Sequence, residues 1–300
     1  MKNIITLFSF ILIITSCDVV EGPYLIDDGG ITPIDTSTNT YVKKVLIEDF
    51  TGHTCPNCPA AARELEAIHE EYGGQIIGMA LHVSATFARP PTHEAPKFQY
   101  DFRTIWGANW DNFFGISDIG LPKGMVNRVG YPNDYKLGKN EWLAVVITEL
   151  EKEIDFGINI TTAISGGNGA ITINTELLNT IDGDYNLVVC LTESNIINWQ
   201  KDGTENIEDY KHNHVLRTVL TDDALSTSST YTSGDDIPKS ITINLSTLEQ
   251  YNIDYSANTA EAGNGNAGGW VAENISVIAY IYDNATQEIV QVEEAHLINE

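Results

Sequence analysis

Two cysteines separated by two residues are the part of this sequence best suited to chemistry. Cys55 and Cys58 enclose Pro56 and Asn57 in the stretch "FTGHTCPNCPAAARELEAIHEEYG", residues 50–73. A CxxC pair can act as a redox couple, supply half of a zinc site, or form a structural disulfide. In a redox couple one thiolate attacks the disulfide of a partner protein, and the second thiol then releases that partner.

A metal site would need more ligands than the surroundings of the pair offer. Structural zinc usually takes two such pairs, whereas the other cysteines, Cys17 and Cys190, stand alone. His53 and His69 follow no spacing typical of a zinc or copper site. Cys190 lies in the apolar run "YNLVVCLTE", where an unpaired cysteine usually belongs to the core. The sequence therefore predicts no metal and no cofactor.

The segments around the pair predict a strand, a helix and a second strand. "YVKKVLIEDF" (41–50) and "QIIGMALHV" (75–83) are apolar, β-branched runs, and the apolar residues between them recur at helical spacing until Gly73. Unpaired N–H groups and the dipole at a helix N-terminus lower the pKa of a thiol located there. We therefore expect Cys55 to be the attacking thiol and Cys58 the resolving thiol.

Two further residues complete the predicted catalytic set of Cys55, Cys58, Asp49 and Pro122. Asp49 stands on the first strand, six residues before Cys55, where thioredoxins commonly carry a buried acid that moves the proton of the second cysteine. The alternative is a strand-end carboxylate that caps the loop. "GISDIGLPKGMVNR" (115–128) resembles the thioredoxin segment in which a cis-proline, here Pro122, faces the disulfide.

An insertion rich in aromatic residues, 84–114, separates the second strand from Pro122. It can form a lid or groove beside the disulfide, or a helical insert that packs its rings onto the sheet. The rings are those of Phe98, Tyr100, Phe102, Trp106, Trp110, Phe113 and Phe114. "KNEWLAVVITELEKEI" (139–154) then predicts the helix that closes a thioredoxin-like domain of residues 41–155.

The second half, residues 156–300, predicts an immunoglobulin-like β-sandwich, so the expected fold class is α/β plus all-β. Its alternating, β-branched runs are separated by Gly, Asn and Asp. The six strand candidates are "AITINTELL", "DYNLVVCLTE", "HVLRTVLT", "KSITINLST", "ENISVIAYIYD" and "EIVQVEEAHLI".

Several polar residues of the second half could either bind a ligand or only form local hydrogen bonds and ion pairs. His212 and His214 in "HNHVLR" are expected on one face of a strand, where they either hold a ligand or satisfy local hydrogen bonds. Arg217 is expected to pair with a carboxylate. Loop aspartates suggest either calcium or solvated turns; they are Asp182, Asp184, Asp222, Asp223, Asp235 and Asp236.

Charge and motifs exclude several classes of function. The chain has 42 acidic residues against 16 basic ones, a formal net charge of −26. A phosphate backbone must be met by Lys and Arg, so nucleic acid is excluded as a partner. No nucleotide-binding loop, Ser-His-Asp triad or paired-carboxylate motif indicates a transferase or hydrolase.

The N-terminus predicts export and lipid anchoring. Lys2, an apolar run over 4–14 and Thr15-Ser16-Cys17 resemble a bacterial lipobox, whose cysteine becomes the lipidated first residue. The alternative is an ordinary signal peptide with Cys17 as a chance neighbour. We expect a signal peptide over 1–17, anchoring through lipid on Cys17, and a flexible tether over 18–40. An envelope compartment lets disulfides persist.

Three segments together resemble a known family: "VLIEDFTGHTCPNCPAA", "WDNFFGISDIGLPKGMVNR" and "HNHVLR". The sequence is similar to exported proteins of Bacteroidetes-type bacteria related to outer membrane protein 28. That resemblance implies a thioredoxin-like domain followed by a β-rich domain on an envelope lipoprotein of the outer membrane.

Two functions follow as hypotheses. The first is thiol-disulfide exchange between the CxxC pair and exported proteins, which would make the protein an oxidoreductase. The second is a non-catalytic, binding or adhesin-like lipoprotein in which the pair is a structural disulfide.

Overall fold

The computed structural model describes residues 41–258 and 263–298. The lipidation expected at Cys17 and the tether over 18–40 lie outside these ranges. These described residues belong to a single compact unit.

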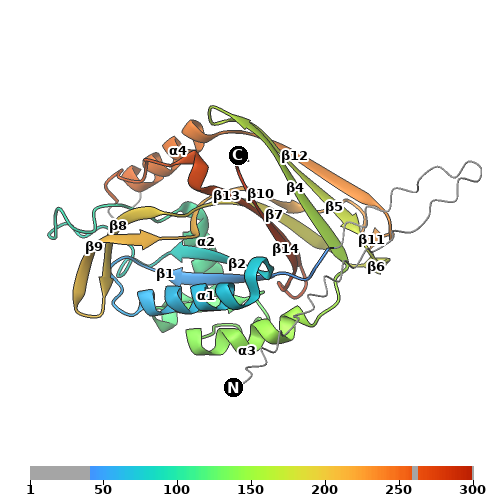
Figure 1. Ribbon diagram of the computed structural model, residues 1–300, viewed down its shortest axis with the longest axis horizontal. Helices are drawn as coiled ribbons and strands as arrows, with labels where there is room; N and C mark the ends of the chain where they lie inside the picture. The colour runs from blue at the N-terminus through green and yellow to red at the C-terminus, as the bar shows by residue number, and fades with distance from the viewer. Residues whose placement is uncertain (1–40, 259–262, 299–300) are drawn as a thin grey trace, which may run out of the picture. The chain divides into compact units, whose positions relative to one another are not determined.

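A seven-stranded mixed sheet contains strands from both halves of the chain (Figure 1). Its order is β14-β13-β7-β10-β2-β1-β3. β1 and β2 are parallel, and β3 is antiparallel to β1. The strands are β1 (Val45–Thr51), β2 (Ile76–His82), β3 (Lys123–Val126), β7 (Tyr185–Glu193), β10 (Val215–Ala224), β13 (Ile275–Asp283) and β14 (Ile289–His296).

Helices cover both faces of the β1–β2 part of this sheet. The α1 helix (Cys58–Tyr72) and the α3 helix (Lys139–Leu150) pack on one face, where Leu65 and Trp142 contact Val45 and Ile47 in one core cluster. The α2 helix (Ile105–Phe114) packs on the other face, with Trp110 in the cluster that contains Leu46 and Phe50. Alternate residues of β1 therefore serve two cores, as the two-residue period of a strand requires.

A second, three-stranded antiparallel sheet packs against β7 and β13. Its order is β12-β5-β4, with β4 (Phe156–Ser165), β5 (Asn168–Leu177) and β12 (Asp236–Asn244). Ile171 and Ile173 of β5 share a buried cluster with Val189 of β7 and Val277 of β13. These apolar residues recur every second position, which is why the two sheets can form a layered β structure.

The remaining elements lie outside these two sheets. The β8–β9 hairpin and the β6–β11 pair are separate two-stranded sheets. The elements are β6 (Ile181–Asp182), β8 (Ile196–Asp202), β9 (Glu205–His212), β11 (Thr230–Tyr231), the α4 helix (Leu245–Asn258) and the short helices η1 (Gly73–Gln75), η2 (Ser117–Ile119) and η3 (Ala272–Asn274).

A buried ion pair joins the first part of the chain to β13. The Arg128 guanidinium donates to both carboxylate oxygens of Glu48, at 2.9 and 2.8 Å, and to the hydroxyl of Tyr280 at 2.8 Å. The rings of Trp110 and Phe114 also lie within cation–π distance of the guanidinium. A buried charge of this kind is tolerable only because its donors are occupied.

The coarse class expected from the sequence is confirmed: mixed helices and strands are followed by a mostly β second half. All six strand candidates of the second half are strands. The boundary at 155/156 stays a prediction, and strands from both sides of it share the seven-stranded sheet.

Candidate functional site

Cys55 and Cys58 form a disulfide at the start of α1, with a Cα–Cα distance of 5.5 Å. The helix begins at Cys58, and Pro59 occupies its first turn. A proline is favourable there because the first N–H groups of a helix have no intrahelical acceptor. Only 1% of the surface of each cysteine is exposed. In this disulfide form the two sulfurs are equally buried, and the roles of Cys55 as attacking thiol and Cys58 as resolving thiol stay predictions.

The β8–β9 hairpin covers the disulfide loop. The Lys201 N–H donates to the carbonyl oxygen of His53, and the Gly203 N–H donates to that of Pro56, both at 2.8 Å. The buried Gln200 amide donates to the carbonyl oxygen of Cys55 at 3.3 Å. In Figure 1 this hairpin lies beside α1 and β1. Three contacts thus bind this hairpin to the backbone of the disulfide loop.

An ion pair on the outside of the hairpin adds to these contacts. Arg63 of α1 and Asp202 of the hairpin approach to 2.8 Å, and their side chains are 60% and 29% exposed. Exposed ion pairs contribute little stability, so the buried amide and backbone contacts must hold most of the hairpin in place.

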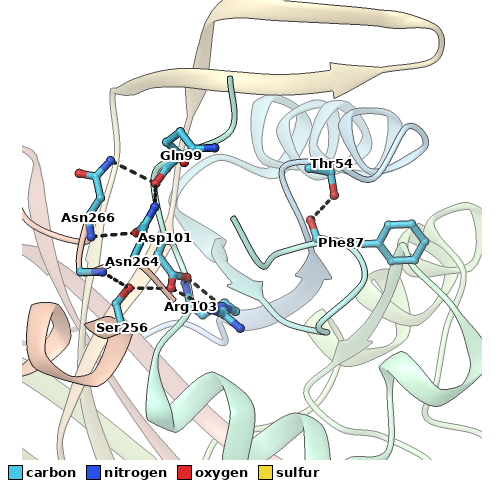
Figure 2. Close-up of polar contacts among 9 residues, drawn as sticks. Thr54, Phe87, Gln99, Asp101, Arg103, Ser256, Asn264 and Asn266 are labelled. Carbon is cyan, nitrogen blue, oxygen red and sulfur yellow. Dashed lines mark hydrogen bonds and ion pairs between the residues drawn. The ribbon is translucent and has the colours of Figure 1, made fainter. Parts of the chain in front are cut away.

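The insertion covers the loop from a second direction. The Thr54 N–H and hydroxyl both donate to the carbonyl oxygen of Phe87 at 3.0 Å. Further along, Asp101 accepts from Arg103 at 2.9 Å and from the hydroxyl of Ser256 at 2.7 Å. Figure 2 shows both anchoring points. The insertion is therefore attached to the disulfide loop at one end and to α4 at the other.

The aromatic rings of the insertion are divided between the two predicted roles, a cover beside the disulfide and a helix packed onto the sheet. Phe98 stacks on His53 next to the disulfide loop, with ring centroids 5.8 Å apart. Trp110 and Phe114 lie instead in the sheet core, and Phe113 is exposed. The first part of the insertion thus forms a cover, and its helical part packs onto the sheet.

A small cavity lies next to Cys58. Its volume is about 60 Å³, and its lining includes Asp49, His82, Tyr210 and His212. Such a volume accommodates a few water molecules. Asp49 Oδ1, His82 Nδ1 and His212 Nε2 are buried and have no hydrogen-bond partner. The structure therefore brings the predicted acid Asp49 to the cavity beside Cys58, together with three histidines, His82, His212 and His214.

Burial governs the protonation of these groups. It raises the pKa of Asp49 from 3.8 to about 7 and lowers the pKa of His53 and that of His212 to about 3. The pKa of His82 also lies well below 6.5, first through burial and then through His212. Desolvation disfavours the charged form in each case. At neutral pH the histidines are uncharged, and Asp49 is partly protonated.

Pro122 has the cis peptide bond expected of it, after Leu121. It immediately precedes β3, whose first residue, Lys123, pairs with Phe50 of β1. The loop to Cys55 leaves the same end of β1. Of the predicted set, Asp49 and Cys58 therefore line one cavity, while Pro122 lies at the adjacent strand end.

The expectation that His212 and His214 share one strand face is wrong. His212 ends β9 and is buried, whereas His214 lies between β9 and β10 with a φ of 56°. The left-handed residue turns the chain, so alternation does not carry across it. Arg217 pairs with buried Glu193 at 2.7 Å, and Cys190 is a free, buried core cysteine; both confirm the sequence-based expectations.

The β8–β9 hairpin, which covers the disulfide loop, is the part of the site that the sequence did not predict. A two-residue loop that begins with Gly is a hairpin signal, and Gly203-Thr204, between the paired residues Asp202 and Glu205, is such a loop. Neither its pairing with the CxxC loop nor the buried position of Gln200 has a local signature. Within residues 41–258 and 263–298, no three His, Cys, Asp or Glu side chains are arranged to hold a metal ion.

Solved structures with a similar fold include HBP35 of Porphyromonas gingivalis, at 16% identity and a TM-score of 0.56, over 86% of this chain and 76% of that one. A protein from Agrobacterium tumefaciens has 12% identity and a TM-score of 0.48, over 87% and 97% of the two chains. A domain of the outer membrane lipoprotein Omp28 from P. gingivalis has 17% identity and a TM-score of 0.28, over 49% and 90%. No curated protein matches the chain.

A family model described as "Outer membrane protein Omp28" matches residues 109–300. The match includes β3, α3 and the whole β-rich half, and it begins after the disulfide. Helices in the described part of the chain are all too short or too polar to span a membrane. The expected location, the cell envelope at the outer membrane, is confirmed by the family. The chain belongs to the Omp28 family of outer membrane proteins.

Proposed function

We propose that this protein is an outer-membrane lipoprotein that acts by binding, and that its CxxC pair is a structural disulfide on a thioredoxin-like core. The burial of Cys55 carries this proposal: 1% of its surface is exposed. Exchange requires the disulfide of a partner to reach the attacking thiolate. The insertion is bonded to Thr54 and the hairpin to Cys55 and Pro56, so both would have to move away before a partner could reach the buried sulfur of Cys55.

The local topology supports a thioredoxin-like core. β1 and β2 are parallel and joined by α1, which gives the strand-helix-strand unit with the cysteines at the helix start. An antiparallel strand, β3, follows a cis-proline. The layered sheets of the second half support a sandwich of the immunoglobulin type.

Lipid on Cys17 would supply the membrane contact. Several acyl chains give stable anchoring, which would account for association of the protein with the outer membrane. A Cys17→Ser variant is expected to lose acylation, measured by incorporation of a labelled fatty acid and by release from the membrane fraction. Retention of the label in this variant would overturn the anchor.

Thiol-disulfide exchange is the second candidate, favoured by one observation. Asp49 lies beside Cys58 at a cavity large enough for a few water molecules, and burial raises the pKa of its carboxyl to about 7. A carboxyl with this pKa can take a proton from a thiol and return it. This chemistry needs the hairpin to leave the disulfide.

The reduction potential and the reactivity of Cys55 separate the two candidates. A structural disulfide should have a potential below about −300 mV. In a Cys58→Ala variant, Cys55 should react with iodoacetamide far more slowly in the native protein than in denaturant. A potential between about −270 and −120 mV, with mixed disulfides trapped in cells by this variant, would establish exchange instead.

A further inference from the structure

Three buried histidines meet where the hairpin and the insertion cover the disulfide loop. His53 belongs to that loop, His82 ends β2, and His212 ends β9 of the hairpin. All three rings lie against Phe102 of the insertion, with centroids 5.8, 4.5 and 4.5 Å from the centroid of that ring. These three residues, the histidine cluster, therefore connect the loop, the sheet and both parts of the cover.

Most ring nitrogens of the histidine cluster have no hydrogen-bond partner among the residues that the structure describes. They are both nitrogens of His53, Nδ1 of His82 and Nε2 of His212, and all four are buried. A protonated imidazole donates from both nitrogens and carries a charge. Burial of an unpaired charge is far more costly than burial of a neutral ring. The closed cover is therefore suited to uncharged histidines only.

The nearest permanent charges oppose protonation of the histidine cluster. Burial lowers the pKa of all three histidines most, and the positive charges of Arg103 and Arg217 lower it further. The neighbouring carboxylates cannot act as counter-charges, because Asp101 pairs with Arg103 at 2.9 Å and Glu193 with Arg217 at 2.7 Å. Each arginine thus keeps its own carboxylate occupied.

The other ionisable groups around the adjoining cavity also supply no buried negative charge in acid. Burial raises the pKa of Asp49 on β1 to about 7, so this carboxyl is protonated below that pH. Glu66 of α1 and Lys211 of the hairpin are exposed. Burial raises the pKa of Tyr210, which is therefore neutral. Burial lowers the pKa of His214, so this ring responds to acid in the same direction as the cluster.

We infer that the histidine cluster is an acid-sensitive switch, and that protonation of its rings releases the β8–β9 hairpin and the insertion from the disulfide loop. Opening would hydrate rings that the closed cover keeps dry and uncharged. The hairpin is a separate two-stranded sheet, so it can leave without breaking a strand pair of the two larger sheets. The inference adds pH control to the cover and holds whether the disulfide is structural or reactive.

The pH range follows from the difference between buried and hydrated histidines. A hydrated histidine binds its proton near pH 6.5, whereas burial lowers the pKa of His53 and His212 to about 3. Between these values the open form binds more protons, so acid favours it. From pH 7.5 to pH 5, each histidine hydrated on opening shifts the equilibrium about 30-fold towards the open form. Asp49 opposes this shift, by up to about 70-fold if it is fully hydrated.

The test measures reduction of the disulfide by a phosphine at pH 7.5 and pH 5 in the full-length, disulfide-intact protein. Each rate is divided by the rate of the denatured protein at the same pH. We expect this normalised rate to rise at least about tenfold in acid, the net effect of two hydrated histidines against Asp49. Far-UV circular dichroism should stay unchanged, because the sheets remain folded.

His53→Phe is the decisive variant, because it removes one titrating ring and can keep the stacking on Phe98. Both nitrogens of His53 are unpaired, so the substitution breaks no hydrogen bond and should preserve stability. It should reduce the acid-induced rise about 30-fold. His93→Phe removes a histidine of the insertion whose side chain is 81% exposed, and this matched control should behave like the wild type.

Two further variants keep the test decisive if His53→Phe does not fold. His212→Asn should reduce the rise to the same extent. Asp49→Asn should enlarge it, by up to about 70-fold, because the opposing group is lost. A normalised rate that does not rise at pH 5 in the wild type or in Asp49→Asn would overturn the inference. So would a rise that both histidine variants retain, or one that coincides with loss of the circular dichroism signal.

Discussion

The Gly203 N–H donates a hydrogen bond of 2.8 Å to the carbonyl oxygen of Pro56, the residue that follows Cys55. The turn of the β8–β9 hairpin is thereby bonded to the inside of the CxxC motif, 147 residues earlier in the chain. Because Gly203 has a φ of 58°, glycine suits this turn. Reduction of the disulfide should therefore depend on how often the hairpin opens.

Removal of the outer ion pair should make the disulfide easier to reduce. Arg63→Ala breaks the contact with Asp202 and leaves the fold intact, because Arg63 is exposed. An exposed pair contributes at most about 1 kcal/mol, so the rate of reduction by a phosphine should rise up to about fivefold. Lys239→Ala breaks a similarly exposed pair with Asp223 at 3.0 Å and is the matched control. Equal rates for both variants would show that this ion pair does not restrain the hairpin.

Loss of the disulfide should lower stability without disrupting the fold. The closed loop is short, so a Cys55→Ala/Cys58→Ala variant should lose about 2 kcal/mol in free energy of unfolding by the chain-entropy estimate. Denaturant titrations followed by circular dichroism measure this loss. A reductant should lower the midpoint of the wild type and leave the variant unchanged. A variant as stable as the oxidised wild type would argue against a structural role.

Asp49→Asn should change how stability depends on pH. Burial raises the pKa of Asp49 from 3.8 to about 7 in the folded protein, so the folded state binds more protons than the unfolded state between these pH values. Stability of the wild type relative to the variant should therefore fall as pH rises from about 4 to 7. Above pH 7 the variant should be more stable by up to about 4 kcal/mol. Parallel pH profiles of the unfolding free energy would contradict this account.

Removal of one partner of the buried pair between Glu48 and Arg128 should be severely destabilising. Glu48→Gln leaves the Arg128 guanidinium buried without its counter-charge, at an expected cost of about 3 to 5 kcal/mol. Arg128→Met should be similarly costly, because Glu48 is then unpaired. The double variant should lose less than the sum of the two single losses in equilibrium unfolding. Additive losses would mean that the two charges do not interact.

Local sequence patterns predicted most helices and strands because the residues that specify each element lie within a short stretch of the chain. The helix that begins at Cys58 and the six strands of the second half follow their apolar periodicity. The α4 helix was missed because the strand pattern of "KSITINLST" runs directly into it. Asn244, whose side chain accepts from the Thr247 N–H at 2.8 Å, is the capping signal that marks its start.

The accessibility of the site could not be predicted from sequence. Proximity to a helix start indicated reactivity at Cys55, but reactivity also depends on what covers the sulfur. Here the cover includes Gln200 and Gly203, which reach the CxxC loop through tertiary contacts only. Likewise, the sharing of one sheet by β2 and β10 depends on the pairing of Ala80 with Val215, which no local pattern records.

The strand order of the large sheet also determines when the protein can complete its core. β2 pairs with β1 along one edge and with β10 along the other. At the second edge the Ala80 N–H donates to the carbonyl oxygen of His214 at 2.8 Å. A chain that is synthesised from its N-terminus therefore carries an open β2 edge until Val215 and the rest of β10 have been made. Open edges recruit other strands, so early truncation products should associate with one another, and chaperones should hold the nascent protein until β10 arrives.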